Sequence, residues 1–320
     1  MDSLHLAIEN LTSPPVLAFV LGALAVVLRS DLRLPDPIHT WLATYLLLAI
    51  GLKGGHALRG VEVGEVVGPA AATVALGVAI PVVVFLVAWK AIRVPLADAG
   101  SLAAHYGSVS VVTFTAALTF AASADFRVEG FMTSLVALLE VPGIVVALVL
   151  VSVRREGTDL RAAVQEVLTG RSVLLLVGGL VIGFVTSEAA FLRVEPLFVD
   201  LFTGFLVLFL LDMGATAAAR LRDSRGLRPG VVILALAAPV VLGVLGVLAG
   251  SLVGLSVGGA AVLGTMAASA SYIAAPAAVR TALPDADPGL SLGAALGVTF
   301  PFNLAIGIPM MFVVSRAVGA

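Results

Sequence analysis

Long runs of apolar residues dominate this sequence, and their length limits what the chain can fold into. A helix needs about 20 apolar residues to cross about 30 Å of hydrocarbon. By this rule the sequence predicts ten membrane-spanning helices, at 14–29, 40–58, 66–89, 101–122, 130–153, 172–191, 197–219, 229–253, 256–280 and 289–315. Of the 320 residues, 12% are charged, against about a quarter in soluble domains. We therefore expect an all-α integral membrane protein.

The chain lacks the residues on which several classes of function depend. It has no cysteine, which excludes disulfides and Cys-ligated metals. The four histidines are too far apart in sequence for a zinc motif: His5, His39, His56 and His105. The formal net charge of −2 gives no basic surface for nucleic acid. No P-loop and no nucleophile–base pair occur within the apolar runs, so we expect no enzyme activity, no nucleic-acid partner and no organic cofactor.

The distribution of Lys and Arg predicts the orientation in the membrane. Thirteen of the 18 Lys and Arg residues fall in loops on one side of the ten predicted spans. Basic residues concentrate in cytoplasmic loops. We therefore predict a multi-pass protein of the plasma (inner) membrane, with both termini outside and the polar segment 154–171 in the cytoplasm.

The two halves of the chain resemble each other at a nearly constant offset of about 160 residues. Three matches occur in the same order: LLLAIGLKGGHALR (46–59) with LFLLDMGATAAAR (208–220), AAHYGSVS (103–110) with AASAS (267–271), and Pro142 with Pro301. Five spans per half is an odd number, so the second half must be inverted. We predict two inverted five-helix repeats, 1–153 and 172–320, joined by the linker 154–171, with core and gate parts interleaved between them. Inverted repeats are typical of carriers that alternate access around a midplane site.

Two matching segments place small and hydroxyl residues inside apolar spans. HYGSVSVVTFTAALT (105–119) and SASYIAAPAAVRT (269–281) each suit a helix that is interrupted. Two discontinuous helices would direct backbone N–H groups and helix N-termini at a small anion. The candidate substrate-binding residues are Tyr106, Gly107, Ser108, Val109, Ser110, Ser269, Ala270 and Ser271. Close helix packing through small residues is the alternative, but the recurrence of Ser-x-Ser at the repeat offset favours binding.

Ionisable residues within the apolar runs form a second signal. Such residues are costly in a membrane and usually functional. Glu140 precedes Pro142 at the centre of a predicted span, and we expect Glu140, Asn303 and Thr113 to bind Na⁺. The alternative is a neutral Glu140 that braces two helices.

Two further charges lie within predicted spans. Asp212 is either functional or paired with an arginine near the cytoplasmic end of its span. For Lys53 we favour a side chain that reaches the outer surface of the membrane.

At these residues the chain resembles the sodium-dependent bicarbonate transporter family, SbtA. The resemblance runs nearly end to end, and its most specific segments are LLLAIGLKGG and GVTFPFNLAIGIP. It implies a 5+5 inverted repeat, a homotrimer and a core that moves against a gate. It also implies elevator-like symport of bicarbonate with Na⁺ across the plasma membrane, with bicarbonate held between Gly107 to Ser110 and Ser269 to Ser271.

The same resemblance implies partners other than substrate. Some family members are regulated by a soluble PII-like protein, SbtB, at the cytoplasmic face, and the basic loops suit anionic membrane lipid.

Two other functions stay open from the residues alone. One is a Na⁺-coupled symporter for another small anion, such as an organic carboxylate or sulfate. The other is a passive anion channel.

Overall fold

The computed structural model describes residues 8–30, 32, 34–155, 160–223 and 227–319, and every regular element in these ranges is a helix. The helices of the first half are α2 (Pro14–Val27), α3 (Asp36–Leu58), α4 (Val63–Leu86), η1 (Val87–Ile92), α5 (Leu96–Gly107), α6 (Val111–Ser123) and α7 (Met132–Ser152). Those that follow are α8 (Leu160–Thr169), α9 (Arg171–Val185), α10 (Glu188–Phe191), η2 (Pro196–Asp200), α11 (Phe202–Asp223), α12 (Pro229–Leu252), α13 (Val257–Ala267), α14 (Ala275–Ala282), α15 (Pro288–Leu292), η3 (Gly293–Thr299), α16 (Phe300–Phe302), η4 (Asn303–Gly307) and α17 (Ile308–Gly319).

Each of the ten predicted spans coincides with a helical segment. Within the described ranges, six segments are long and apolar enough to cross a membrane, and a seventh qualifies if α8 and α9, which meet at a 47° bend, are one span. The multi-pass character is therefore confirmed, and the count of ten crossings stays a prediction. The linker 154–171 differs from a plain connection, because it contains the amphipathic helix α8, which buries Ala163 and Val167.

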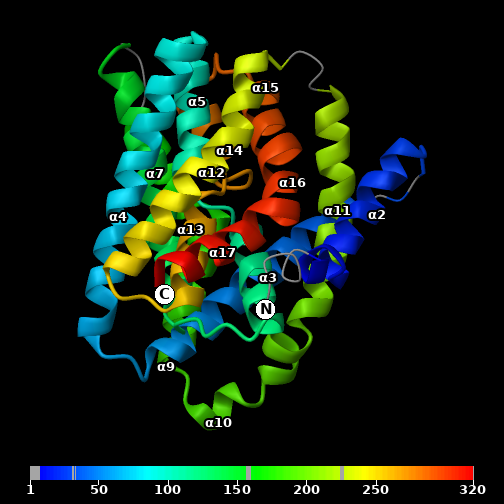
Figure 1. The fold of residues 1–320 in the computed structure, drawn as a ribbon, viewed down its shortest axis with the longest axis vertical. Coiled ribbons are helices and arrows are strands. Elements are labelled where there is room, and N and C mark those ends of the chain that lie inside the picture. The colour runs from blue at the N-terminus through cyan, green and yellow to red at the C-terminus, as the bar shows by residue number, and fades with distance from the viewer. Residues whose placement is uncertain (1–7, 31, 33, 156–159, 224–226, 320) are drawn as a thin grey trace.

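The helices pack in two groups, which we call the scaffold helices (α2, α3, α9 and α11) and the core helices (α4 to α7 and α12 to α17). Within the scaffold, α3 packs mainly on α9 and α2 mainly on α11. In the core, α4, α5 and α7 pack together, and α12 and α17 pack on α13. Figure 1 shows α2 and α11 side by side at one edge of the molecule, with α4 and α7 at the opposite edge.

Glycines set the two closest crossings in the scaffold. A Cβ atom on Gly214 would lie 1.9 Å from the carbonyl oxygen of Phe19 in α2. A Cβ atom on Gly183 would lie 2.1 Å from the carbonyl oxygen of Leu52 in α3. Small residues allow such close approach of helices in membranes. Gly22 and Gly55 make the reciprocal contacts. The two crossings are equivalent in the repeat, because Gly22 corresponds to Gly183 at an offset of 161 residues and Gly55 corresponds to Gly214 at an offset of 159 residues.

Large apolar side chains are exposed on the outer faces of α2, α4 and α9. Examples are Leu21 at 55%, Val67 at 58% and Leu174 at 65% exposure. Contiguous exposed apolar surface on this scale is unfavourable in water, and it suits a surface that faces lipid.

Candidate functional site

The first helix interruption lies between α5 and α6. Ser108 leaves the helix in an extended conformation, with φ −102° and ψ 160°. Ser110 then caps α6, since its Oγ accepts a hydrogen bond from the Thr113 N–H at 3.2 Å. Serine is a favoured residue at this position because its oxygen satisfies a free N–H of the first turn. The predicted interruption at 107–110 is confirmed.

The second interruption lies between α13 and α14 and is longer, covering residues 268–274. Ser271 plays a capping role here, because its Oγ accepts hydrogen bonds from the N–H groups of Ala274 (3.3 Å) and Ala275 (3.4 Å). The Asn303 amide donates to the freed carbonyl of Ala268 at 2.8 Å. The predicted interruption of this span is also confirmed.

The two interruptions hydrogen-bond directly to each other. The Ser110 N–H donates to Ser269 Oγ at 2.9 Å, and the Ser271 N–H donates to the His105 carbonyl at 2.7 Å. In hydrocarbon an unsatisfied backbone group costs several kcal/mol. Each interruption therefore supplies partners for the other, which joins two segments about 160 residues apart in the chain.

We call this pair of hydrogen-bonded interruptions, 107–110 and 268–274, the joint. Helix α7 crosses directly behind the joint and brings a carboxyl group to it. A Cβ atom on Gly143 would lie 1.7 Å from the Gly107 carbonyl oxygen, so only glycine fits at this crossing. Glu140 lies one helical turn before Gly143 and is 1% exposed. Its Oε2 has no hydrogen-bond partner among the residues that the structure describes.

A small cavity lies where the joint and α7 meet. Its lining residues are Val109, Ser110, Val111, Glu140, Ser172, Ser271, Tyr272 and Ile273. The cavity volume is about 10 Å³, close to the space that one water molecule needs. Ser110, Ser271 and the buried carboxyl group therefore line one cavity.

Not all predicted substrate-binding residues reach this cavity. Val109, Ser110 and Ser271 line it, whereas Tyr106, Gly107, Ser108, Ser269 and Ala270 do not. Tyr106 is turned toward α12: its hydroxyl donates to Thr299 Oγ1 at 2.6 Å, and Thr299 donates onward to the Ala235 carbonyl at 2.7 Å. The hydroxyl of Ser108 is buried with no partner in the described chain.

Four lining residues were missed from the sequence, the apolar Val111 and Ile273 and the polar Ser172 and Tyr272. Tyr272 directly follows Ser271, so the motif SASYIAAP contains it, and its position next to a capping serine is a usable signal. Ser172 stands in the first turn of α9 and belongs to no motif. Only the packing of α9 on α7 brings Ser172 to the cavity.

The three candidate Na⁺ ligands are placed differently. Glu140 lines the cavity, while Thr113 and Asn303 are buried but do not line it. Asn303 Oδ1, like Glu140 Oε2, is a buried oxygen without a partner in the described ranges. Carboxylate and amide oxygens are ligands that hard cations accept. No group of three or more His, Cys, Asp or Glu that could hold a metal occurs among the described residues.

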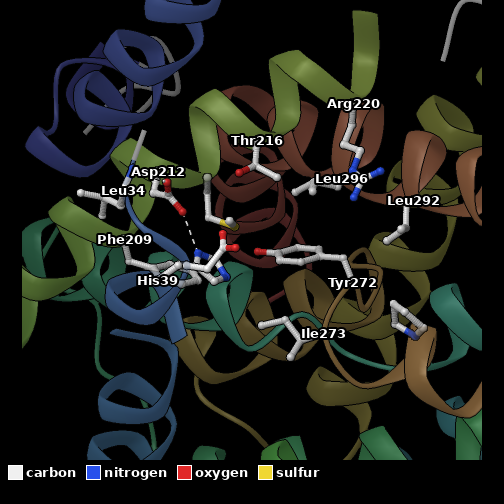
Figure 2. Close-up of a pocket in the computed structure, with 13 residues that line it drawn as sticks. Leu34, His39, Phe209, Asp212, Thr216, Arg220, Tyr272, Ile273, Leu292 and Leu296 are labelled. Carbon is white, nitrogen blue, oxygen red and sulfur yellow. Dashed lines mark hydrogen bonds and ion pairs between the residues drawn. The ribbon is translucent and has the colours of Figure 1, made fainter. Parts of the chain in front are cut away.

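A larger pocket of about 340 Å³ lies between the scaffold and core helices. Asp212 lines it and pairs with His39, Oδ2 to Nδ1 at 2.6 Å, rather than with an arginine. Figure 2 shows these two side chains directed toward each other, with the Tyr272 ring extending into the pocket. Tyr272 and Ile273 line both this pocket and the small cavity, so these two residues separate them.

Comparison with known families gives an independent result. The model of the family described as the Na⁺-dependent bicarbonate transporter superfamily matches residues 14–316. A search of curated proteins found no match. The family match includes both interruptions and the whole of α7, and it confirms the resemblance seen in the sequence. The chain belongs to the Na⁺-dependent bicarbonate transporter superfamily.

Proposed function

We propose that the protein is a sodium-coupled symporter that takes up bicarbonate across the plasma membrane by alternating access. The observation that carries this proposal is the cavity shared by Ser110, Ser271 and Glu140 at the joint of two interrupted helices, in a chain of this superfamily. Hydroxyl groups and helix N-termini bind a small anion without requiring a buried cation. A carboxyl group without a partner suits the coupling ion instead.

Bicarbonate binds at the joint, with the hydroxyls of Ser110 and Ser271 as donors. Ser110 stands at the start of α6, where the positive end of the helix dipole favours an anion. Ser271 lies four residues before α14, and its hydroxyl contacts the N–H groups of Ala274 and Ala275. A cavity of about 10 Å³ is too small for bicarbonate. Binding therefore requires Tyr272 and Ile273 to move, which opens the cavity into the larger pocket.

Sodium binds next to the anion, with Glu140 as the charged ligand and Asn303 and Thr113 as further oxygen donors. Glu140 Oε2 and Asn303 Oδ1 are buried without partners in the described chain, and buried polar atoms rarely stay unpaired. A Na⁺ ion between the carboxylate and bicarbonate would attract both anions and offset their mutual repulsion, which favours binding the two ions together.

The transport cycle moves the core helices against the scaffold helices, elevator-like, within a homotrimer. Ten crossings in two inverted five-helix repeats, 1–153 and 172–320, underlie this cycle, with 154–171 in the cytoplasm. The equivalent glycine crossings of α2 on α11 and α9 on α3 support the repeat relation. The separation of the contacts into two groups supports the relative motion.

Uptake of labelled bicarbonate by proteoliposomes tests the proposal. Assays at alkaline pH keep little of the label as CO₂. We expect saturable uptake that requires an inward Na⁺ gradient and is lost when K⁺ replaces Na⁺. Competition of the labelled uptake by excess formate, acetate or sulfate identifies the class of anion. If one of these anions competes more strongly than unlabelled bicarbonate does, that anion is the substrate. Conductance without saturation would instead indicate a channel.

A further inference from the structure

Lys53 lines a second cavity between the scaffold and core helices. This cavity has a volume of about 150 Å³ and is lined by Ile50, Lys53, Leu118, Thr119, Ala122, Thr133, Val199, Phe202 and Thr203. The Lys53 ammonium group lies 4.6 Å from the centre of the Phe202 ring. The three ion pairs within the described chain do not include Lys53. A half-buried cation without a carboxylate partner in the described chain thus borders a largely apolar cavity.

Three hydroxyl groups face the same cavity. Thr119, Thr133 and Thr203 line it from α6, α7 and α11. Within the described ranges none of these hydroxyls has a protein hydrogen-bond partner, whereas the Thr115 hydroxyl, one turn before Thr119 in α6, bonds to the Val111 carbonyl at 2.8 Å. An ammonium group and three hydroxyl donors are therefore free to bind a ligand or water. This donor set suits an anion.

The repeat relation connects this cavity with the pocket of Figure 2. At an offset of 159 residues, Ile50 corresponds to Phe209 and Lys53 to Asp212, and each pair lines its own pocket. Thr133 corresponds to Leu292 in the same way. Three lining residues of each pocket therefore occupy equivalent positions in the two halves. If the halves are inverted, the pockets face opposite sides of the membrane, and the Lys53 cavity is the outer one.

The charges at the two equivalent positions, Lys53 and Asp212, have different partners. Asp212 is paired with His39 in the inner pocket, whereas Lys53 lies over the Phe202 ring and has no carboxylate partner among the described residues. A charge in a low-dielectric environment costs free energy unless it is paired, and a cation–π contact at this distance offsets only part of that cost. An incoming anion would supply the missing partner.

We propose that the Lys53 cavity is a second anion-binding site, which holds a small monovalent oxyanion on the outer side before it reaches the joint. Its distance from the joint follows from α6, because nine residues separate Ser110 from Thr119, about 13 Å of helix. The two sites are therefore distinct. That the anion is bicarbonate rests on the proposed function, whereas the binding of an oxyanion at Lys53 does not.

The composition offers a direct test, because Lys53 and Lys90 are the only lysines in the chain. Biosynthetic labelling with ¹³Cε-lysine gives two side-chain NMR signals in the detergent-solubilised full-length protein. Lys90 is exposed on η1 and serves as the internal control. The signal that disappears in Lys53→Arg is assigned to Lys53. If that variant does not fold, the signal that remains in Lys90→Arg gives the same assignment. The protein is titrated in two separate series, in which bicarbonate or nitrate replaces gluconate at constant ionic strength and without Na⁺.

We expect the Lys53 signal to shift with saturation while the Lys90 signal stays in place. Thr119→Val should weaken this binding by about tenfold, because it removes one hydrogen bond to a charged ligand. Thr115→Val, one turn earlier in α6 and outside the cavity, should leave it unchanged. A Lys53 signal that does not move, or that moves in parallel with Lys90, would overturn the inference.

The outcome is separable from that of the proposed function. If uptake is Na⁺-coupled but the Lys53 signal is unaffected by anions, the second site is wrong and the proposed function stands. If no Na⁺-coupled uptake occurs but Lys53 binds bicarbonate or nitrate, the site stands without that function. Lys53→Met gives a third readout, since loss of an outer site should raise the KM for uptake several-fold and leave kcat nearly unchanged.

Discussion

Ser271 allows the proposed substrate binding to be tested separately from folding. Its hydroxyl accepts hydrogen bonds from the N–H groups of Ala274 and Ala275 at the beginning of α14, and the residue also lines the small cavity. The cap contributes about 1 kcal/mol to stability, and a hydrogen bond to a bound anion contributes about 1.5 to 3 kcal/mol to affinity. These two contributions can be measured independently.

We predict that Ser271→Ala raises the KM for bicarbonate uptake by about tenfold and lowers the melting temperature slightly. Uptake kinetics and thermal unfolding in detergent measure the two effects. Ser123→Ala is the matched control, because Ser123 bonds only to the Phe120 carbonyl near the end of α6. A loss of stability with unchanged kinetics would show that Ser271 has a packing role alone.

Glu140→Gln keeps the size of the side chain and removes its charge. If Glu140 binds Na⁺, the Na⁺ concentration for half-maximal uptake should rise by about tenfold, which corresponds to about 1.4 kcal/mol of binding free energy. Uptake measured over a series of Na⁺ concentrations tests this. The exposed Glu65→Gln serves as the control. An unchanged Na⁺ dependence would favour the alternative, a carboxylic acid that braces two helices.

At the residue scale, the sequence predicts the joint better than it predicts the cavity. The Ser-x-Ser pairs can be found because they recur at the repeat offset, and both sit at helix interruptions. Side-chain direction does not follow from the repeat. Tyr106 turns to Thr299 and Ser269 holds the joint together, while Ser172 reaches the cavity through packing between distant helices.

At the element scale, α9 shows how glycine spacing sets a helix crossing. Gly183 lies against the backbone of α3, whereas a Cβ atom on Gly178 would contact nothing within 4 Å. Both are in the same helix, and neither lines the small cavity. Substitutions at Gly178 and Gly183 therefore measure the effect of helix propensity and the effect of close packing separately.

We predict that Gly183→Ala destabilises the protein by about 1 to 3 kcal/mol, because the added methyl group forces α9 away from α3. Gly178→Ala should be neutral or stabilising, since alanine favours a helix by up to about 1 kcal/mol over glycine. Thermal unfolding in detergent compares the two. Equal effects would contradict the close crossing.

The ten apolar segments were predictable because hydrocarbon thickness fixes their length. Helix α8 was not, since 154–171 is polar and its two buried residues, Ala163 and Val167, become evident only when it packs on α14. The π-helical turns η3 and η4 also escaped prediction. They surround Pro301 in α16, and local adjustments of this kind around proline leave no periodic signal.

At the scale of the whole molecule, the inverted arrangement requires the linker and the α10 region to lie on opposite sides of the membrane. The chain has no cysteine, so single cysteines can be introduced without removing others. Arg161 in α8 and Arg193 after α10 are both exposed. We predict that an impermeant maleimide labels Arg193→Cys in intact cells, whereas Arg161→Cys reacts only after permeabilisation. The reverse pattern would overturn the orientation.

The coupling of bicarbonate to Na⁺ is the central claim, and steady-state accumulation in proteoliposomes tests it most directly. Labelled bicarbonate is measured inside the vesicles at alkaline pH while the Na⁺ gradient is varied and K⁺ with valinomycin holds the membrane potential constant. We predict accumulation above the external concentration that rises with the inward Na⁺ gradient and reverses to efflux when that gradient is reversed. An internal concentration that never exceeds the external one, whatever the Na⁺ gradient, would contradict it.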